Sequence, residues 1–293
     1  MTLASLTSSR LALPVAMALA RWVPERLLLR LADALAGRSA LETSPSAMAV
    51  RANQAVVRGL SKDSPEIDRA VRAVFRSAGR GHVALFRALA RGRQALMDGC
   101  DVAPELIERI EIARRAGRGL VLVGPHVSAF DFFLLTIAAR GYPMQAISPA
   151  NPTATYRLQN ALRTEFGAET TPASREAVKA AIERLTNGGI VGTGMDRPAP
   201  KGDWIEFFGH QAYLPTGFAK LAIRTKSMLL PGVLLPAGAG HYRAEALELL
   251  EPPTERTEEA AHSLAREVLR QMEPVIRSYA DDWLMFHPVW PDG

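Results

Sequence analysis

The sequence predicts an α/β fold in which helices flank a mixed central sheet and a helical N-terminal region precedes it. Residues 45–115 carry helical patterns rich in Ala, Arg and Leu, with little strand signal. After residue 119, short apolar runs alternate with helical segments, which is typical of a sheet packed between helices. The chain has no internal repeat and no long linker. We therefore expect one domain over 1–293, with a helical part at 1–115 and an α/β core at 116–293.

The individual elements follow in order from hydrophobic spacing and from turn residues. Examples of helices in the first part are Pro65–Arg80, Val83–Ala95 and Pro104–Ala116. Strands of the core are expected at 120–123, 144–148, 189–194, 228–235 and near 242–250. Core helices are expected at 129–139, 153–165, 174–186, 216–225 and 257–280. Turns are expected at Gly141-Tyr-Pro143, Asn151-Pro152 and Glu251-Pro-Pro-Thr254.

The most informative residues, His126 and Asp131, follow the first core strand. Leu120–Val123 is a short apolar run rich in β-branched residues, and Gly124-Pro125 ends it. His126 therefore lies at a strand-to-helix corner, where open α/β sheets place their ligands, and Asp131 lies in the first helical turn. A carboxylate near one ring nitrogen fixes the histidine tautomer and leaves the other nitrogen free to accept a proton. The two residues are a candidate His–carboxylate dyad.

The same segment also allows a purely structural interpretation. Ser128 and Asp131 have the Ser-x-x-Asp spacing of a capping box, so Asp131 is equally a candidate for binding backbone N–H groups at a helix start. His126 would then be a loop residue without a chemical role. The two interpretations are compatible with each other.

The five-residue step from His126 to Asp131 after a short strand resembles the His-x4-Asp motif of the glycerolipid and lipid A acyltransferases. Later motifs follow in an order similar to that of the late acyltransferases of lipid A synthesis and the related phosphatidylinositol mannoside acyltransferases. In this sequence they are Tyr156-Arg157, Arg163, Arg175, Ile190–Gly194, Met195-Asp196-Arg197-Pro198, Ile205-Glu-Phe-Phe-Gly209, Leu214-Pro-Thr-Gly217, Ala219-Lys-Leu-Ala222 and Asp282–Trp290. The resemblance covers residues 10–290.

This resemblance implies acyl transfer from a thioester to a hydroxyl group of a membrane lipid or glycolipid, a lipid A precursor or a similar molecule. His126 would remove the hydroxyl proton as general base, and Asp131 would orient its ring. Arg163 and nearby backbone N–H groups would bind the oxyanion. Acyl-CoA or acyl carrier protein would supply the acyl group, and no metal or redox cofactor would be required.

The resemblance also implies binding roles for other residues. Arg157 and Arg175 would bind phosphates or support the cleft, and Asp196 would hold Arg163 or an acceptor sugar. Phe208 and Gly209 would line the acyl or acceptor cavity.

Phe208 and Thr216, which lie within the motifs of the resemblance, also have structural interpretations. The aromatic pair Phe207-Phe208 fits ordinary core packing. Thr216 fits a plain helix cap, although the helix start after it would also offer N–H groups to a phosphate.

The sequence departs from the lipid A acyltransferases at three points. Those enzymes usually carry Asp-x-Asp where this chain has Asp196-Arg197-Pro198, often have Glu in place of Asp131, and usually begin with a clear membrane-spanning helix. A non-catalytic peripheral membrane protein that binds lipid and retains the fold is therefore an alternative, although His126 and Asp131 argue against it. A thioesterase, which releases thiol without an acceptor, is a third hypothesis.

The composition predicts acidic partners. The formal net charge is +5, and only five of the 35 basic residues are lysine. Because guanidinium groups bind phosphates bidentately, we expect phospholipid headgroups, coenzyme A phosphates or an acidic carrier protein as partners. Nucleic acid is not expected, because the chain lacks interleaved aromatic and basic residues and finger spacings.

The N-terminus predicts contact with a membrane surface without a membrane span. Leu11–Ala20 is uncharged for only ten residues, whereas about 20 apolar residues are needed to cross a bilayer. A secretory signal is not expected either. An apolar helix interspersed with arginines is expected to continue past Pro24, which favours binding in the interface of anionic lipid within residues 1–35; a core-packing helix is the alternative. The expected location is the cytoplasmic face of the inner membrane, as a peripheral or monotopic protein.

Other motifs that carry chemistry are missing from the sequence. No metal site is expected, because the six histidines show no metal-ligand spacing and the single cysteine, Cys100, excludes a cysteine-based zinc site. Cys100 is expected to be structural. The chain has no Gly-x-Ser-x-Gly elbow, and Gly192-Thr-Gly194 and Gly238-Ala-Gly240 lack the third glycine of a dinucleotide-binding loop.

Overall fold

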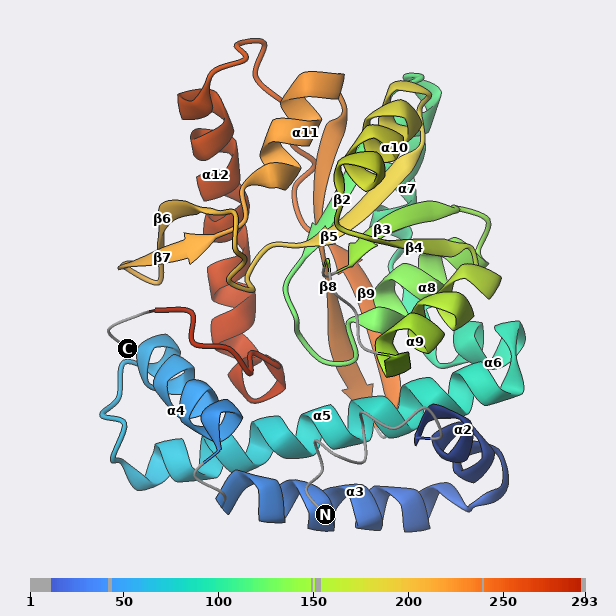
Figure 1. The fold of residues 1–293 in the computed structure, drawn as a ribbon, viewed down its shortest axis with the longest axis vertical. Coiled ribbons are helices and arrows are strands. Elements are labelled where there is room, and N and C mark those ends of the chain that lie inside the picture. Colours follow the sequence, from blue (N-terminus) through green and yellow to red (C-terminus); the bar gives the residue numbers. More distant parts are fainter. Residues whose placement is uncertain (1–11, 42–43, 149, 151–153, 239, 291–293) are drawn as a thin grey trace.

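The apolar runs after residue 119 form most of a seven-stranded sheet in the computed structural model of the chain (Figure 1). The structure describes residues 12–41, 44–148, 150, 154–238 and 240–290. The strand order is β1-β9-β8-β2-β5-β3-β4, and an antiparallel β6–β7 hairpin forms a separate small sheet. The strands are β1 (Cys100–Val102), β2 (Leu120–Gly124), β3 (Met144–Ser148), β4 (Ala168–Pro172), β5 (Ile190–Gly194), β6 (Asp203–Phe207), β7 (His210–Leu214), β8 (Met228–Gly238) and β9 (His241–Ala246).

The sheet is mixed, as the sequence predicts. Strands β8, β2, β5, β3 and β4 are parallel to one another, β9 is antiparallel to β8, and β1 pairs parallel with β9. The flanking helices are α6 (Arg93–Asp98), α7 (Pro104–Arg115), α8 (Asp131–Ala139), α9 (Ala154–Glu165), α10 (Arg175–Thr186), α11 (Gly217–Thr225) and α12 (Glu258–Ser278). The expected fold class, an α/β core with a helical N-terminal region, is confirmed.

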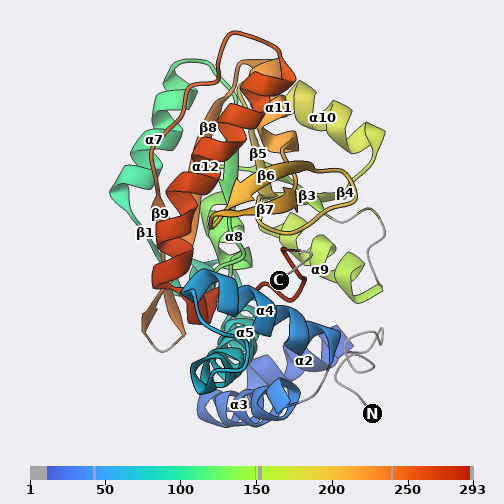
Figure 2. The same ribbon diagram turned by 90° about the vertical axis from the view of Figure 1, so that its left-hand side faces the viewer.

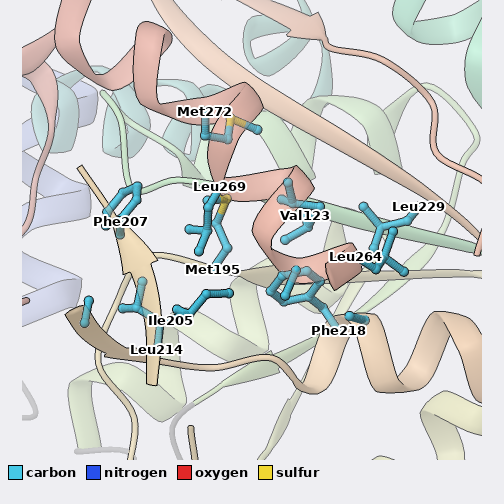
Figure 3. Close-up of a cluster of buried hydrophobic side chains, with 14 of the residues drawn as sticks. Val123, Met195, Ile205, Phe207, Leu214, Phe218, Leu229, Leu264, Leu269 and Met272 are labelled. Carbon is cyan, nitrogen blue, oxygen red and sulfur yellow. The ribbon is translucent and has the colours of Figure 1, made fainter. Parts of the chain in front are cut away.

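The strand β2 shows why helices cover both faces of the sheet. All four of its apolar side chains are buried, and successive side chains of a strand point to opposite faces. Val121 and Val123 pack into a cluster with residues of α10, α11, α12 and the hairpin, and Figure 3 shows part of this cluster. Leu120 and Leu122 pack into a second cluster with residues of α6, α7, α8 and the long helix Pro65–Arg91. A strand that is buried on both faces has a continuous apolar sequence, and this pattern predicts β2 from the sequence.

The N-terminal helices α2 (Ala12–Trp22), α3 (Glu25–Leu41), α4 (Pro45–Arg58) and α5 (Pro65–Arg91) gather at one end of the molecule (Figures 1 and 2). The sequence predicts two helices where α5 is continuous. Its internal glycine Gly81 is a packing position, because a Cβ there would lie 3.2 Å from the Cβ of Ala129. The expected continuation of the first apolar helix past Pro24 is wrong, because α2 ends at Trp22 and α3 starts anew at Glu25.

Three further strand regions were not predicted from the sequence. β1 has only three residues, β4 has the polar pattern Ala-Glu-Thr-Thr-Pro, and the β6–β7 hairpin turns at Phe208-Gly209. Both turn residues have positive φ, 53° and 75°, which matches a two-residue hairpin turn. Among the described residues, no helix is both long and apolar enough to span a membrane.

Candidate active site

Strand register brings His126 and Asp196 together at the carboxyl edge of the sheet. Gly124, the last residue of β2, pairs with Gly194, the last residue of the parallel neighbour β5. His126 lies two residues beyond Gly124, and Asp196 lies two residues beyond Gly194. Gly194 also makes room for the imidazole, because a Cβ at that position would lie 2.8 Å from Cε1 of His126.

Asp196 holds His126 through two hydrogen bonds. Its Oδ1 lies 2.6 Å from Nδ1 of the imidazole, and its Oδ2 accepts the backbone N–H of His126 at 2.8 Å. The carboxyl group is fully buried, with 0% of the residue exposed. Since a carboxylate only accepts hydrogen bonds, Nδ1 carries the proton and Nε2 is the basic nitrogen of the neutral ring.

Asp196 remains ionised although it is buried. Burial alone would raise the pKa of its carboxyl group, because a charge is poorly stabilised away from water. Attraction to the His126 ring, together with hydrogen bonds from that ring, from the Trp283 indole and from the His126 backbone, outweighs burial and lowers the pKa below its usual value. The side chain is therefore an acceptor that fixes the imidazole in one tautomer.

The C-terminal segment, which is distant in the sequence, contacts both Asp196 and the backbone around His126. The indole Nε1–H of Trp283 donates to Asp196 Oδ2 at 2.7 Å, and Trp283 is almost fully buried. Trp283 also forms an isolated antiparallel bridge with Val127, and the Leu284 N–H donates to the His126 carbonyl at 2.7 Å. Asn53 of α4 secures the segment, because its Nδ2 donates to the carbonyl of Met285 and its Oδ1 accepts the N–H of Val289.

Asp131 pairs with Arg163 in the structure. Arg163 Nη2 donates to Asp131 Oδ2 at 2.8 Å, and Nη1 donates to Asn160 Oδ1 at 2.8 Å. Only 11% of the Arg163 side chain and 20% of the Asp131 side chain are exposed. The expected partners are therefore exchanged: Asp196 rather than Asp131 binds the His126 ring, and Asp131 rather than Asp196 binds Arg163.

The expected capping box is wrong. Helix α8 starts at Asp131 with Phe130 at the N-cap and no side-chain cap bond. Ser128 adopts a positive φ of 54°, and its buried Oγ has no hydrogen-bond partner among the described residues. At α11, Thr216 does occupy the N-cap position, but its hydroxyl donates to the Asp203 carboxylate instead of capping the helix.

A cavity of about 1260 Å³ opens over His126. Its apolar lining comes from β2, α8, α10 and β8, and includes Leu122, Leu134, Ile182 and Val233. Six lining residues are basic: Arg163, Arg175, Lys179, Arg197, Lys201 and Arg224. Among the described lining residues Asp131 is the one acid, so the cavity combines an apolar wall with a positive field.

The other residues singled out from the sequence are not all brought together. Arg175 lines the cavity at the start of α10. Arg157 lies in α9, but its side chain is outside the described part of the structure. Phe208 and Gly209 do not appear among the cavity-lining residues; Phe208 is 8% exposed and packs in the core near Trp290, so the core-packing interpretation holds for it.

Two contributors to the site were missed in the sequence: Gly194 and Trp283. A glycine two residues before Asp196 matches the glycine two residues before His126, and this repeated spacing was a usable signal. For Trp283 the sequence has no comparable signal, because the contact depends on how the last part of the chain folds back over the sheet.

The described residues contain no group of three His, Cys, Asp or Glu side chains that could hold a metal ion. Cys100 is buried, and burial raises the pKa of its thiol to about 11. A thiol with such a high pKa is a poor nucleophile near neutral pH, which agrees with the expected structural role.

Comparisons with known proteins match the chain to one protein family and to several similar proteins. The family model described as bacterial lipid A biosynthesis acyltransferase matches residues 9–291. A phosphatidylinositol mannoside acyltransferase of Mycolicibacterium smegmatis is 27% identical over 228 residues, which cover 76% of this chain and 73% of that protein. Its namesake from Mycobacterium tuberculosis (strain CDC 1551 / Oshkosh) is 26% identical over 224 residues, which cover 75% of this chain and 66% of that protein.

Proposed function

The chain belongs to the bacterial lipid A biosynthesis acyltransferase family, and from this premise we propose that it transfers a fatty acyl chain from a thioester to a hydroxyl group of a membrane glycolipid. The observation that carries the proposal is a histidine with a fixed tautomer at the floor of an apolar, cation-rich cavity. An acyl chain fits the apolar wall, and a phosphate-bearing reactant fits the positive field.

The proposed reaction begins at Nε2 of His126. Nε2 takes the proton of the acceptor hydroxyl while the hydroxyl oxygen attacks the thioester carbonyl carbon. The tetrahedral intermediate then collapses, the C–S bond breaks, and the thiolate leaves and takes the proton from the imidazolium. Asp196 holds the ring and stabilises the imidazolium that forms between these steps.

Arg163 and Asp131 have a supporting role in this proposal. Arg163 lines the same cavity as His126, and its guanidinium is a donor for the oxyanion. Asp131 fixes the guanidinium through the 2.8 Å contact, so Asp131 acts through Arg163 in this scheme.

The acceptor that we propose is a phosphorylated glycolipid. The two relatives are named for phosphatidylinositol mannoside, whereas the family model is described by lipid A biosynthesis; both are glycolipids. The donor class that fits the family is acyl-CoA or acyl carrier protein, with the thioester as the reacting group.

We also propose that α2 and α3 lie on the cytoplasmic face of the inner membrane. Six of the eleven exposed large apolar side chains in the described structure belong to these two helices: Val15, Leu19, Trp22, Leu27, Leu31 and Leu35. On α3 they repeat every four residues, which makes one apolar stripe. Arg21, Arg26 and Arg30 are exposed on the same helices and suit anionic headgroups.

The acyl-transfer proposal is tested with the full chain, acyl-CoA and extracted membrane lipids. We expect free thiol to appear together with an acylated glycolipid, which mass spectrometry identifies. Thiol release that continues without lipid would point to a thioesterase. No thiol release and no acylated lipid with either acyl-CoA or acylated carrier protein would point to the non-catalytic lipid-binding alternative.

The membrane proposal is tested by flotation with anionic vesicles. Leu27→Gln/Leu31→Gln is expected to reduce flotation at least about tenfold, because charge alone gives weak, salt-sensitive binding. The matched control is Leu60→Gln, another exposed leucine, which lies outside α2 and α3. Equal flotation of the double variant and the control would place the membrane surface elsewhere.

A further inference from the structure

The loop between β2 and α8, which we call the His126 loop, pairs through its backbone with the C-terminal segment. The Leu284 N–H donates to the carbonyl of His126 at 2.7 Å, and the Ser128 N–H donates to the carbonyl of Asp282 at 2.7 Å. The residues between these two bonds form the isolated antiparallel bridge already described. Two antiparallel segments joined in this way have a fixed register. The position of Asp282 therefore helps to set the position of the His126 loop.

Ser128 shows that the conformation of the His126 loop is imposed by its surroundings. Its φ is 54°, a value that side-chain-bearing residues rarely adopt. Its Oγ is buried and has no hydrogen-bond partner among the described residues, so the serine gains no bond from its own side chain in this conformation. A residue keeps such a backbone only where the neighbouring structure holds it there.

Helix α5 contacts this arrangement at two positions, one helical turn apart. The hydroxyl of Ser77 donates to Asp282 Oδ1 at 2.6 Å. Gly81 packs against the loop itself, because a Cβ there would lie 3.2 Å from the Cβ of Ala129, closer than an ordinary contact. Residues four apart lie on the same face of a helix. One face of α5 therefore holds the pairing partner of the loop and also limits the space of the loop.

We propose that Ser77 and Gly81 of α5 are positioning residues for His126. Ser77 anchors Asp282, which holds the loop through its backbone, and Gly81 leaves the loop the space that it needs. The inference rests on the proposed acyl transfer, in which His126 is the base, and it adds residues of the N-terminal helices to that machinery. Neither residue is among the described residues that line the cavity. We therefore expect both to affect kcat and to leave KM nearly unchanged.

The first test compares two glycines of α5. Gly81→Ala is expected to lower kcat about tenfold, because its Cβ must displace Ala129 and with it the loop, and small misplacements of a reacting group are costly. Gly79→Ala is the matched control, since its Cβ would meet Ala32 of α3 at 3.4 Å, an ordinary contact. Alanine favours a helix interior more than glycine does, so neither variant is expected to unfold.

The second test compares two serines of the same helix region. Ser77→Ala is expected to lower kcat about tenfold, because Asp282 loses its anchor. Ser64→Ala is the control: Ser64 caps the start of α5 by accepting the N–H of Ile67, so its loss is expected to lower the melting temperature and to leave kcat unchanged. An equal fall of kcat in the two serine variants would assign the effect to the stability of α5 and overturn the role of Ser77.

A readout that does not depend on turnover is the ring ¹⁵N spectrum of His126, assigned by the signals that His126→Ala removes. We expect Gly81→Ala and Ser77→Ala to shift these signals and the two controls to leave them in place. Unchanged signals and unchanged kcat in both variants would overturn the inference. A wild-type chain that acylates no lipid would instead end the acyl-transfer proposal, while the ring signals would still decide whether α5 positions His126.

Discussion

His126 and Asp196 are neighbours because each lies two residues beyond one member of a facing glycine pair, Gly124 and Gly194. They are 70 positions apart in the chain, and this separation does not affect the contact. Parallel strands in fixed register deliver equivalent positions to the same place at the carboxyl edge of the sheet. The tautomer of His126 therefore depends on the β2–β5 pairing.

The first prediction concerns this pair. His126→Ala and Asp196→Asn are each expected to lower kcat at least about 100-fold, the scale of general base catalysis. The amide that replaces the carboxylate in Asp196→Asn would offer the ring a donor in place of one acceptor, which disturbs the tautomer. Because the two residues act as one unit, the double variant is expected to lose little more than either single variant. Additive losses in acyl-transfer assays would contradict the assignment.

The second prediction concerns the space that Gly194 leaves for the ring. Gly194→Ala is expected to reduce kcat by about tenfold, because a Cβ 2.8 Å from Cε1 must displace the imidazole, and small misplacements of reacting groups are costly. Gly217→Ala is the control, since a Cβ there meets nothing within 4 Å. If both variants keep full turnover, the ring position is not critical.

Much of the fold was readable from the sequence because buried parallel strands and amphipathic helices have strong periodic patterns. The run Leu120–Val123 is an example, since both of its faces are covered. Strand β4 has no such pattern, because it lies at the edge of the sheet and its side chains are partly exposed. Its strand state depends on pairing with β3, which a local pattern does not contain.

The site could be predicted only in part, because some of its contacts also depend on strand pairing and helix packing that a local pattern does not contain. His126 was found because a histidine after a buried strand is a local signal. The local spacing predicts Asp131, five residues further along the chain, as its carboxylate partner, but the register of β2 and β5 selects Asp196. Asp131 instead starts α8 and contacts Arg163 of α9, a contact between two helices whose relative placement no local pattern fixes.

The third prediction follows from this exchange of partners. Asp131→Asn and Arg163→Gln are each expected to reduce kcat, and a double-mutant cycle is expected to show coupling of about 1 kcal/mol or more for this largely buried contact. The corresponding cycle for Arg163 and Asp196 is expected to show much weaker coupling, because Asp196 binds His126 and Trp283 instead. Strong coupling in the second cycle would contradict the observed pairing.

The fourth prediction concerns Asp282, whose carboxylate accepts the Ser77 hydroxyl at 2.6 Å. Burial raises the pKa of this carboxyl group, against the hydrogen bond from Ser77 and together with the nearby Asp281 charge. An acid whose pKa is raised by folding binds its proton more tightly in the folded state, so its ionisation costs stability as pH rises through the folded pKa.

Asp282→Asn is therefore expected to raise the melting temperature near pH 8 and to have little effect below about pH 3, where the carboxyl is protonated in both states. Thermal melts at the two pH values measure this difference. Glu251→Gln, which removes a surface ion pair with Arg118 and no charge that acts on Asp282, is the control and is expected to give no stabilisation. A gain for Asp282→Asn that is equal at both pH values would have another origin.

The last prediction concerns Trp283, a positioning residue that acts through Asp196. Trp283→Phe keeps an aromatic ring in the cluster but removes the N–H that Asp196 Oδ2 accepts at 2.7 Å. A hydrogen bond to a charged group contributes about 1.5–3 kcal/mol, and its loss leaves the buried carboxylate less well held. We expect kcat to fall about tenfold while KM changes little, because the indole reaches the ring of His126 through Asp196 and does not line the cavity.

Trp290→Phe is the matched control for this experiment. Trp290 belongs to the same aromatic cluster, with its ring centroid 6.2 Å from that of Trp283, but its indole N–H donates to the backbone carbonyl of Phe207. Both variants lose similar packing, so similar shifts in melting temperature are expected. A selective fall of kcat in Trp283→Phe therefore measures the hydrogen bond to Asp196, whereas equal kcat values in the two variants would reduce Trp283 to a packing residue.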